Sequence, residues 1–472
     1  MTPVMTLQET TALEEIAAAT AGRVVAGSPA LRVSGVTIDS RRAEPGQLFV
    51  AIAGPRFDGH DFVAQAAARG VAAALVHRDV EAPAGLGVVR VADTTHGLAE
   101  LARHARAQAD VPVVCITGSA GKTTTKEMTA ALLGTRGPVL KTEGNLNNQY
   151  GLPLMLLRLR PEHSAAVLEL GMSAAGELRA LSGIARPDVA VITLVAPVHL
   201  EFFASVDEIA AAKAEILEGL AEGGVAVLNG DDPRVKRTGE AHQARGGRVV
   251  WFGRDRAYDV SAENWRGTVH GMRFTLRAGG RAEEVALPLP GPHFLMNFLA
   301  AAAVAHHLGV DIATIAETAS TMKAASHRGE VVSLGQGITL LDDCYNSNPT
   351  AVEAAVTALG MAARGRRVAF LGDMLELGPT GPDLHRQTGE TVGGRLDLLA
   401  AVGPLAQHFL EGARRAGLAS AALVGFPDSA AAAAAAPDLV KPGDAVLVKG
   451  SRGVRMETIV EALRTRFGAA GA

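Results

Sequence analysis

Short apolar runs without polar alternation recur along the chain and are separated by helical stretches. In the middle of the chain these runs are VPVVCIT, AAVLELG, DVAVITLV and GVAVLNG. Strands buried on both faces by crossover helices have this composition, so the pattern predicts a mostly parallel sheet. The rhythm returns after about residue 327 in ITLLDDCYN, RRVAFLGDM, LLAAVG, AALVGF and DAVLVKGS. It predicts a second parallel α/β unit with a Rossmann-like layout. That unit lacks a G-x-G-x-x-G motif after its first strand, so we expect no dinucleotide there.

The flanking segments complete an α/β organisation in three domains. Residues 31–106 mix short strands with the pattern DFVAQAAARGVAAALV, which predicts a helix, a glycine stop and a strand. RVVWFG and GMRFTLRA predict added antiparallel strands between Val249 and Leu289, and GPHFLMNFLAAAAVAHHLG predicts a helix. The predicted domains are residues 1–106, 107–326 and 327–472.

Length and composition agree with this division. A chain of 472 residues fits about three domains at roughly 150 residues each. A net charge of −4 gives no sign of a nucleic-acid surface. Cys115 and Cys344 cannot build a disulfide framework, and neither has metal-ligand spacing in the sequence. We find no export signal and no membrane-spanning run. We therefore expect a cytoplasmic protein, monomeric, without nucleic-acid or membrane partners.

The segment CITGSAGKTTTKEM has the chemistry of a phosphate-binding loop. It follows a predicted strand and opens a predicted helix, which is the context that such a loop requires. Glycines let backbone N–H groups face an anion, and the helix N-terminus favours negative charge. Lys122 can neutralise phosphate oxygens, and the Thr123 hydroxyl can bind Mg²⁺. The spacing is G-x-x-G-K-T, shorter than the usual loop, yet every functional part is present. A glycine-rich turn with a chance lysine is the alternative.

An ordered set of motifs resembles the Mur ligase family, the ATP-dependent amide ligases of bacterial cell-wall precursor synthesis, which are related to folylpolyglutamate synthases. The loop is followed in family order by LELGMS, APVHLEFF, AAKAEIL, GPHFLMN, HRGE and DDCYNSNP, covering about residues 30–455. Further stretches, GNLNNQYGLPLMLL, LGDMLELG and VKGSRGVRME, resemble the member that adds D-alanyl-D-alanine to UDP-N-acetylmuramoyl-tripeptide. The resemblance implies a uridine-nucleotide domain, a central ATPase domain and a C-terminal Rossmann-like domain.

The resemblance also implies a reaction and an ATP site. ATP would phosphorylate a carboxylate to an acyl phosphate, and an amine would then displace the phosphate. His293 and Asn297 would lie at the adenine, Arg328 at the phosphates and Asp343 at the ribose. The phosphate loop itself would contribute Thr117, Gly118, Ser119, Ala120, Gly121, Lys122, Thr123 and Thr124. Family members often carry Asn or Thr where this chain has Ala120, a change that removes no backbone donor.

The same resemblance assigns Mg²⁺ ligands. Glu169, at the end of its predicted strand, would share one Mg²⁺ with Thr123. His199 and Lys213 would bind a second Mg²⁺, with Lys213 carbamylated by CO₂ so that it offers an anionic oxygen. Taken alone, Glu169 would be a loop residue, His199 a structural histidine and Lys213 a surface lysine.

The resemblance also implies which residues bind the substrates. The resemblance places Ser40 and Arg41 at the uridine nucleotide. The muramoyl sugar and peptide stem would face Asn145, Asn147 and Asn148, and the D-alanyl-D-alanine acceptor would face Tyr345, Asn346 and Asn348. Three Asn within four residues otherwise favour a plain turn.

Three other functions remain as alternatives. The sister ligase that adds a diamino acid to the dipeptide precursor is disfavoured because DDCYNSNP occupies the place of its DYAHTP-like stretch, and no DNPR-like motif is present. A folylpolyglutamate synthase would have no counterpart of DSRRAEPGQLFVAIAG. A nucleotide switch would bind nucleotide without forming a product. The third residue of the stem peptide, diaminopimelate or lysine, stays open.

Overall fold

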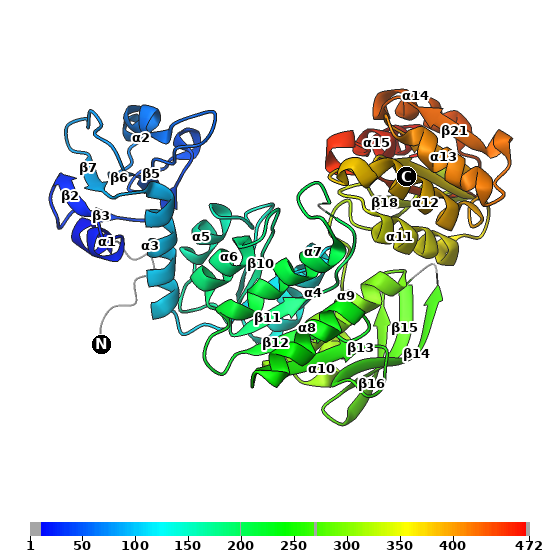
Figure 1. The fold of residues 1–472 in the computed structure, drawn as a ribbon, viewed down its shortest axis with the longest axis horizontal. Helices are drawn as coiled ribbons and strands as arrows, with labels where there is room; N and C mark the ends of the chain where they lie inside the picture. The colour runs from blue at the N-terminus through cyan, green and yellow to red at the C-terminus, as the bar shows by residue number, and fades with distance from the viewer. Residues whose placement is uncertain (1–10, 199, 269–270, 469–472) are drawn as a thin grey trace. The chain divides into compact units, whose positions relative to one another are not determined.

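The computed structural model describes residues 11–198, 200–268 and 271–468, and helices alternate with strands through most of them (Figure 1). The chain divides into two compact units. The first runs to Thr117 and also contains Leu133–Val191 and Ala214–Ala226. The second contains Gly118–Leu132, Ile192–Lys213 and the chain from Val227 onward.

The N-terminal part holds a five-stranded sheet of order β2-β7-β6-β5-β4, in which β2 is antiparallel to β7 and the other strands are parallel. Phe49, Val63 and Val88 belong to the apolar core of this part. The predicted helix, glycine stop and strand are present, with Gly70 at φ +90°. The elements are β1 (Thr11–Ala12), α1 (Leu13–Ala19), β2 (Arg23–Ala26), β3 (Arg32–Val33), β4 (Val36–Thr37), β5 (Leu48–Val50), α2 (Val63–Ala68), β6 (Ala73–Val76), β7 (Gly87–Arg90) and α3 (Thr94–Gln108).

The central sheet has nine strands in the order β16-β15-β14-β13-β12-β11-β8-β10-β9. All four apolar runs predicted for this region form strands, β8 (Val113–Thr117), β10 (Ala165–Glu169), β11 (Val189–Ile192) and β12 (Val225–Asn229). Strand β10 pairs in parallel with β8 and with β9 (Val139–Lys141). The helices of this region are α4 (Lys122–Leu133), α5 (Gly151–Leu156), α6 (Glu177–Ala185), α7 (Val206–Ala214), α8 (Pro233–Ala244), α9 (Pro292–His307) and α10 (Ile312–Ala319).

The antiparallel prediction is confirmed for GMRFTLRA, but it is wrong for RVVWFG, which forms a strand paired in parallel. Strand β13 (Arg248–Gly253) pairs in parallel with β14 (Val260–Thr268), whereas β14, β15 (Gly271–Ala278) and β16 (Arg281–Leu287) form an antiparallel meander. Apolar side chains alternate with polar ones along β15, which is the pattern of a strand with one buried face.

The C-terminal part is a six-stranded sheet of order β17-β18-β22-β19-β20-β21. Helices α11, α12 and α13 contribute residues to one apolar cluster and α14 and α15 to another, so both faces of the sheet are covered (Figure 1). All five predicted strands are present and parallel; the short antiparallel edge strand β17 was not predicted. The elements are β17 (Glu330–Ser333), β18 (Thr339–Asp343), α11 (Pro349–Ala362), β19 (Arg367–Gly372), α12 (Gly381–Gly393), β20 (Leu398–Val402), α13 (Ala406–Arg415), β21 (Leu423–Phe426), α14 (Ser429–Leu439), β22 (Ala445–Lys449) and α15 (Glu457–Phe467).

Two further observations bear on the expectations from sequence. Within the described part of the chain, no helix is both long and apolar enough to cross a membrane. Cys115 and Cys344 are free and buried, as expected for a chain without a disulfide framework. The domain boundaries at residues 106 and 326 stay predictions.

Candidate functional site

The predicted phosphate loop is built and anchored as a defined turn. The Ser119 backbone N–H donates to Leu194 O at 2.8 Å, and the Ser119 hydroxyl lies 3.1 Å from Ala196 O and 2.9 Å from Ala196 N. Thr193 Oγ1 donates to Ala120 O at 2.6 Å. The loop is therefore fixed against the segment that follows β11.

Both glycines of the loop are required by geometry. Gly121 has φ +83°, and a Cβ placed on it would lie 2.3 Å from Asn297 Oδ1. Gly118 has φ +152°, and its Cβ would lie 1.8 Å from Thr193 Oγ1. No L side chain fits either position without displacing a neighbour, so the shortened loop keeps glycine where the backbone approaches other groups closely.

Helix α4 begins directly after the loop, with Lys122 as its first residue. Lys122 Nζ donates to Gly118 O at 2.9 Å, so its ammonium is held over the loop. Thr123 and Thr124 lie in the first turn of the helix and are partly exposed. Backbone N–H groups at a helix N-terminus, a lysine over the loop and a hydroxyl in the first turn together form an anion site. Thr117, at the end of β8, is buried and donates to Leu170 O at 3.1 Å.

Lys213 is a buried residue of α7, which excludes the surface-lysine alternative. Its side chain is 2% exposed. Burial, and to a smaller degree the nearby charge of Lys122, hold the pKa of Lys213 well below its usual 10.5. This environment favours the neutral amine, which is the nucleophilic form.

Glu169 lies at the carboxyl end of β10 and is 5% exposed. Its Oε1 accepts a hydrogen bond from Asn147 Nδ2 at 3.0 Å, and its backbone N–H donates to Thr142 Oγ1 at 2.9 Å. The structure thus brings Asn147, from the predicted stem-peptide segment, to this carboxylate. A buried carboxylate held by an amide is an oriented oxygen ligand, which is the kind that Mg²⁺ prefers.

The other two asparagines of this segment have different surroundings. Asn145 is exposed, and its carbonyl accepts from the Asn147 N–H at 2.8 Å. Asn148 Oδ1 accepts from the N–H groups of Tyr150 and Gly151 at the start of α5. Asn148 therefore has a structural role at the helix start. His199 lies outside the described residues.

His293 and Asn297 are one turn apart on α9, and the structure brings Asn297 to the phosphate loop. Asn297 Oδ1 accepts from Thr125 Oγ1 at 3.4 Å, and Gly121 lies directly beside the same amide. Burial lowers the pKa of His293 to about 4, so its imidazole is neutral near pH 7. Its Nδ1 is buried and has no hydrogen-bond partner among the described residues. An unpartnered buried nitrogen one helical turn from Asn297 is available to a ligand.

Asp343 ends β18 at the carboxyl edge of the C-terminal sheet, where parallel α/β folds bind ligands. Its Oδ2 lies 2.6 Å from Lys449 Nζ, and the same ammonium donates to Asn346 O at 3.0 Å. Lys449 is 3% exposed and ends the neighbouring strand β22. Asn346 itself is exposed.

Two arginines flank Tyr345 at the same edge. The guanidinium carbon of Arg328 lies 4.0 Å from the ring centroid, and that of Arg452 lies 4.9 Å from it. Asn348 is 6% exposed and caps α11, because its Oδ1 accepts from the Ala351 N–H at 2.9 Å. Tyr345 is therefore part of a cationic surface, while Asn348 has a structural role that the sequence reasoning did not assign.

The predicted uridine-nucleotide residues lie in the N-terminal part. Ser40 is 7% exposed, and its hydroxyl donates to Gln65 Oε1 at 2.9 Å. Arg41 is paired with Asp39 at 2.9 Å, and its side chain is 80% exposed. Both residues already have a protein partner, but the exposed side chain of Arg41 is the one that solvent reaches.

Sequence reasoning missed Lys449 and Arg452 as members of this edge. Both occur in VKGSRGVRME, a stretch that resembles the family but from which no residue was assigned a role. A lysine that closes an otherwise apolar buried strand was the available signal, because the ends of adjacent parallel strands meet at one sheet edge. The role of Arg452 depends on the turn after β22, which the sequence does not specify.

The chain matches three family descriptions in succession. Residues 32–106 match the Mur ligase family catalytic domain, residues 116–305 the Mur ligase middle domain and residues 327–452 the Mur ligase glutamate ligase domain. The matches therefore fall on an N-terminal, a central and a C-terminal domain.

Individual relatives agree along nearly the whole chain. The UDP-N-acetylmuramoyl-tripeptide–D-alanyl-D-alanine ligase of Escherichia coli strain K12 is 39% identical, over 92% of this chain and 94% of that protein. A crystal structure of MurF from Acinetobacter baumannii has a TM-score of 0.89 and 35% identity, covering 97% of this chain and 99% of that chain. MurF ligase from Thermotoga maritima, in complex with ADP, has a TM-score of 0.80 and 31% identity, covering 92% of this chain and 97% of that chain.

Proposed function

The chain belongs to the Mur ligase family, and we propose that it joins D-alanyl-D-alanine to UDP-N-acetylmuramoyl-tripeptide at the expense of ATP. The product would be the pentapeptide precursor of peptidoglycan. The choice of substrates rests on the similarity to the E. coli ligase. The structural observation that supports an ATP-dependent reaction is the anchored phosphate loop with Lys122 held over it.

The proposed chemistry has two steps. A terminal carboxylate oxygen of the tripeptide attacks the γ-phosphorus of ATP, the bond to the β-phosphate oxygen breaks, and ADP leaves. The amine of D-alanyl-D-alanine then attacks the acyl carbon, loses a proton and displaces inorganic phosphate through a tetrahedral intermediate. Both reactants of the first step are anions, so positioned cations and backbone N–H groups lower the barrier. Lys122 and the N-terminus of α4 supply them.

ATP would be held by residues of the second unit. The neutral His293 and the amide of Asn297 would meet the adenine; the buried, unpartnered Nδ1 of His293 supports this assignment. Arg328 would reach the phosphates and Asp343 the ribose. For the other substrates, Ser40 and Arg41 would meet the uridine nucleotide. The acceptor would meet Tyr345, Asn346 and Asn348, and Asn348 also caps α11.

Mg²⁺ fits the donor set that the chain offers. Glu169 is a buried, oriented carboxylate, and Thr123 offers a hydroxyl in the first turn of α4, so both are hard oxygen donors. We propose that these two residues hold one Mg²⁺ and that His199 and Lys213 hold a second. Bound Mg²⁺ would neutralise the charge of the phosphate oxygens.

Lys213 would become a ligand only after carbamylation. Its buried amine attacks the carbon of CO₂ and releases a proton to solvent, which leaves an anionic carbamate with two oxygen donors. The buried position and the lowered pKa of Lys213 support this step, because only the neutral amine reacts. We expect ¹³C NMR of the protein in ¹³C-bicarbonate to show a carbamate signal. The signal should vanish in Lys213→Arg and persist in Lys323→Arg, a change at an exposed lysine. An unchanged signal in Lys213→Arg would contradict the assignment.

The function is tested by phosphate release from ATP and Mg²⁺ with mass detection of the uridine product. The tripeptide precursor is supplied alone, with D-alanyl-D-alanine, or with each single amino acid. We expect phosphate release only with D-alanyl-D-alanine, together with one pentapeptide product. Activity with a diamino acid and the dipeptide precursor would identify the sister ligase instead. Phosphate release that ignores both substrates would identify a nucleotide switch. The expected monomer and cytoplasmic location are separate proposals, the first tested by sedimentation.

A further inference from the structure

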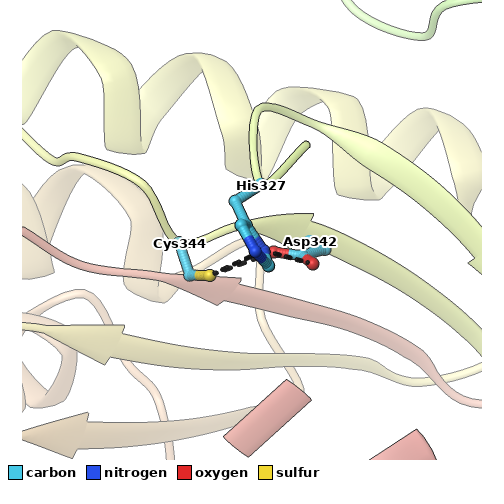
Figure 2. A group of neighbouring side chains, drawn as sticks. All are labelled: His327, Asp342 and Cys344. Carbon is cyan, nitrogen blue, oxygen red and sulfur yellow. Dashed lines mark hydrogen bonds and ion pairs between the residues drawn. The ribbon is translucent and has the colours of Figure 1, made fainter. Parts of the chain in front are cut away.

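Three side chains with metal-binding atoms meet on the C-terminal sheet. Figure 2 shows the imidazole of His327 pointing at the side chains of Asp342 and Cys344. His327 Nδ1 lies 2.9 Å from Asp342 Oδ2 and 3.5 Å from Cys344 Sγ. Cys344 Sγ lies 3.1 Å from Asp342 Oδ1. One nitrogen, one carboxylate oxygen and one sulfur thus lie within 4.8 Å of one another.

The fold produces this cluster from residues that are distant in sequence. Asp342 and Cys344 are two residues apart at the end of β18, so their side chains lie on the same face. Strand β17 is antiparallel to β18, with Glu330 opposite Asp342, and this hairpin returns His327 to the same place. Hydrogen bonds from Gly329 N to Asp342 O and from Tyr345 N to His327 O join the segment before β17 to the end of β18. His327 adopts φ +60°, a conformation that a non-glycine residue rarely holds.

The separations fit a tetrahedral metal. Zn²⁺ bonds of roughly 2.0 to 2.3 Å to nitrogen, oxygen and sulfur place two ligand atoms roughly 3.3 to 3.8 Å apart. The nitrogen-to-sulfur distance of 3.5 Å lies within that range, and the two distances to the carboxylate are within about half an ångström of it. A small outward movement of the Asp342 carboxylate is therefore enough to admit an ion.

We propose that His327, Asp342 and Cys344 form a binding site for a borderline-soft divalent cation, with Zn²⁺ as the best fit and water as the fourth ligand. Thiolate and imidazole select such ions over Mg²⁺, which makes this site chemically distinct from the Mg²⁺ ligands of the proposed reaction. Asp342 and Cys344 are buried, at 0% and 2% exposure, whereas the His327 side chain is 39% exposed. His327 therefore provides the route from solvent and the open side for a water.

Charge and protons balance in the proposed site. In the metal-free protein the Cys344 thiol donates to Asp342, so metal binding must release that proton to solvent. His327 would carry its remaining proton on Nε2 and offer Nδ1 to the metal. Asp342 Oδ2 also lies 3.7 Å from Arg464 Nη2, so the Arg464 guanidinium competes with a metal ion for this carboxylate. Glu330 Oε2 is 3.7 Å from the same Arg464 nitrogen, so Arg464 keeps a carboxylate partner when a metal takes Asp342.

A bound ion would hold the turn that carries Arg328. His327 precedes Arg328, and Cys344 precedes Tyr345, the ring over which the Arg328 guanidinium lies. Joining His327 to Cys344 through one ion would fix these two neighbours relative to each other. The proposed site does not depend on the ligase function, because the three side chains meet whatever reaction the chain catalyses.

The test uses the full-length, tag-free chain after treatment with a chelator. Co²⁺ is added as a spectroscopic probe and Zn²⁺ binding is measured by equilibrium dialysis. We expect one Zn²⁺ per chain, a thiolate-to-Co²⁺ absorption band that Zn²⁺ removes, and one proton released per ion. Cys344→Ser and His327→Gln should each weaken Zn²⁺ binding at least tenfold, while Cys115→Ser, which alters the other buried thiol, should match the parent chain.

Folding is checked in the same samples by circular dichroism. His327→Gln changes a partly exposed side chain, so it keeps the test valid if Cys344→Ser destabilises the core. Absence of the thiolate band in the parent chain would overturn the proposal. Equal Zn²⁺ affinity in the parent chain, Cys344→Ser and His327→Gln would overturn it as well.

Discussion

At the scale of single residues, the site depends on positions where close approach leaves no room for a substitution. Gly121 faces the amide of Asn297, and Gly118 faces the hydroxyl of Thr193. The sequence predicted which loop residues matter, because glycine and Lys-Thr at a helix start have few other uses. It did not predict that Lys213 is buried, because alanine neighbours in AAAKAEIL fit an exposed and a buried helix equally well. Nor could spacing find the cluster of His327 and Cys344, which meets through a hairpin.

Gly121→Ala should impair nucleotide binding. A non-glycine residue at φ +83° costs about 1–2 kcal/mol, and the added Cβ displaces the Asn297 amide beside the loop. We expect at least a tenfold loss of ADP affinity, measured by isothermal titration calorimetry. Gly134→Ala is the matched control, because its Cβ would meet nothing within 4 Å. ADP binding to Gly121→Ala at the parent affinity would show that the loop is not the phosphate site.

His385 should make stability pH-dependent. Its Nδ1 faces Gly381 O at 2.7 Å and its Nε2 accepts from the Met374 N–H at 2.9 Å, so the native state needs the neutral ring. Burial lowers its pKa from 6.5 to about 4. Between pH 6.5 and 4 the unfolded chain carries a proton on His385 and the folded chain does not. The free energy of unfolding therefore falls by about 3 kcal/mol as the pH falls from 6.5 to 4.

Denaturant titrations across pH 4 to 7 test this prediction. The free energy of unfolding should fall less steeply in His385→Gln than in the parent chain over this window. Identical slopes would mean that His385 has the same pKa in the folded and the unfolded protein, which contradicts the prediction.

At the scale of elements, apolar runs predicted most of the central and C-terminal strands that lie in parallel pairs, but they missed the three-residue strand β9 and gave the wrong direction for β13. Runs such as VVCIT and VLVK are buried on both faces, and no turn residue interrupts them. Strand β17 escaped prediction because its sequence EVVS holds only two apolar residues, with a polar residue at each end. Helix starts were also hard to foresee, since Asn348 fits a cap and a substrate contact equally well in the sequence.

Asn348 distinguishes these two roles. Asn348→Ala removes the cap of α11 and should lower the free energy of unfolding by about 1 kcal/mol, whereas Asn348→Asp keeps an accepting oxygen and should stay near the parent value. Denaturant titration measures the free energy of unfolding of both variants. If Asn348→Asp keeps the parent stability and also raises KM for D-alanyl-D-alanine severalfold, the residue contacts the acceptor as well as capping the helix.

At the scale of the whole molecule, the order of α/β units along the chain was predictable, and the three family domains agree with it. Alternating strands and helices restrict a chain to few topologies, because crossover connections are right-handed and short. The meeting of side chains from different elements was not predictable in the same way. Lys449 reaches Asp343 across 106 residues of sequence, and only the strand order that places β22 beside β18 brings them together.

The most direct test of the account follows one oxygen atom. UDP-N-acetylmuramoyl-tripeptide carrying ¹⁸O in its terminal carboxylate is incubated with the chain, ATP, Mg²⁺ and D-alanyl-D-alanine, and the released phosphate is analysed by mass spectrometry. Activation of the carboxylate by phosphorylation predicts one ¹⁸O in each phosphate and a pentapeptide that has lost one. Phosphate without ¹⁸O, or phosphate formed without pentapeptide, would contradict the claim that this chain spends ATP on joining these two substrates.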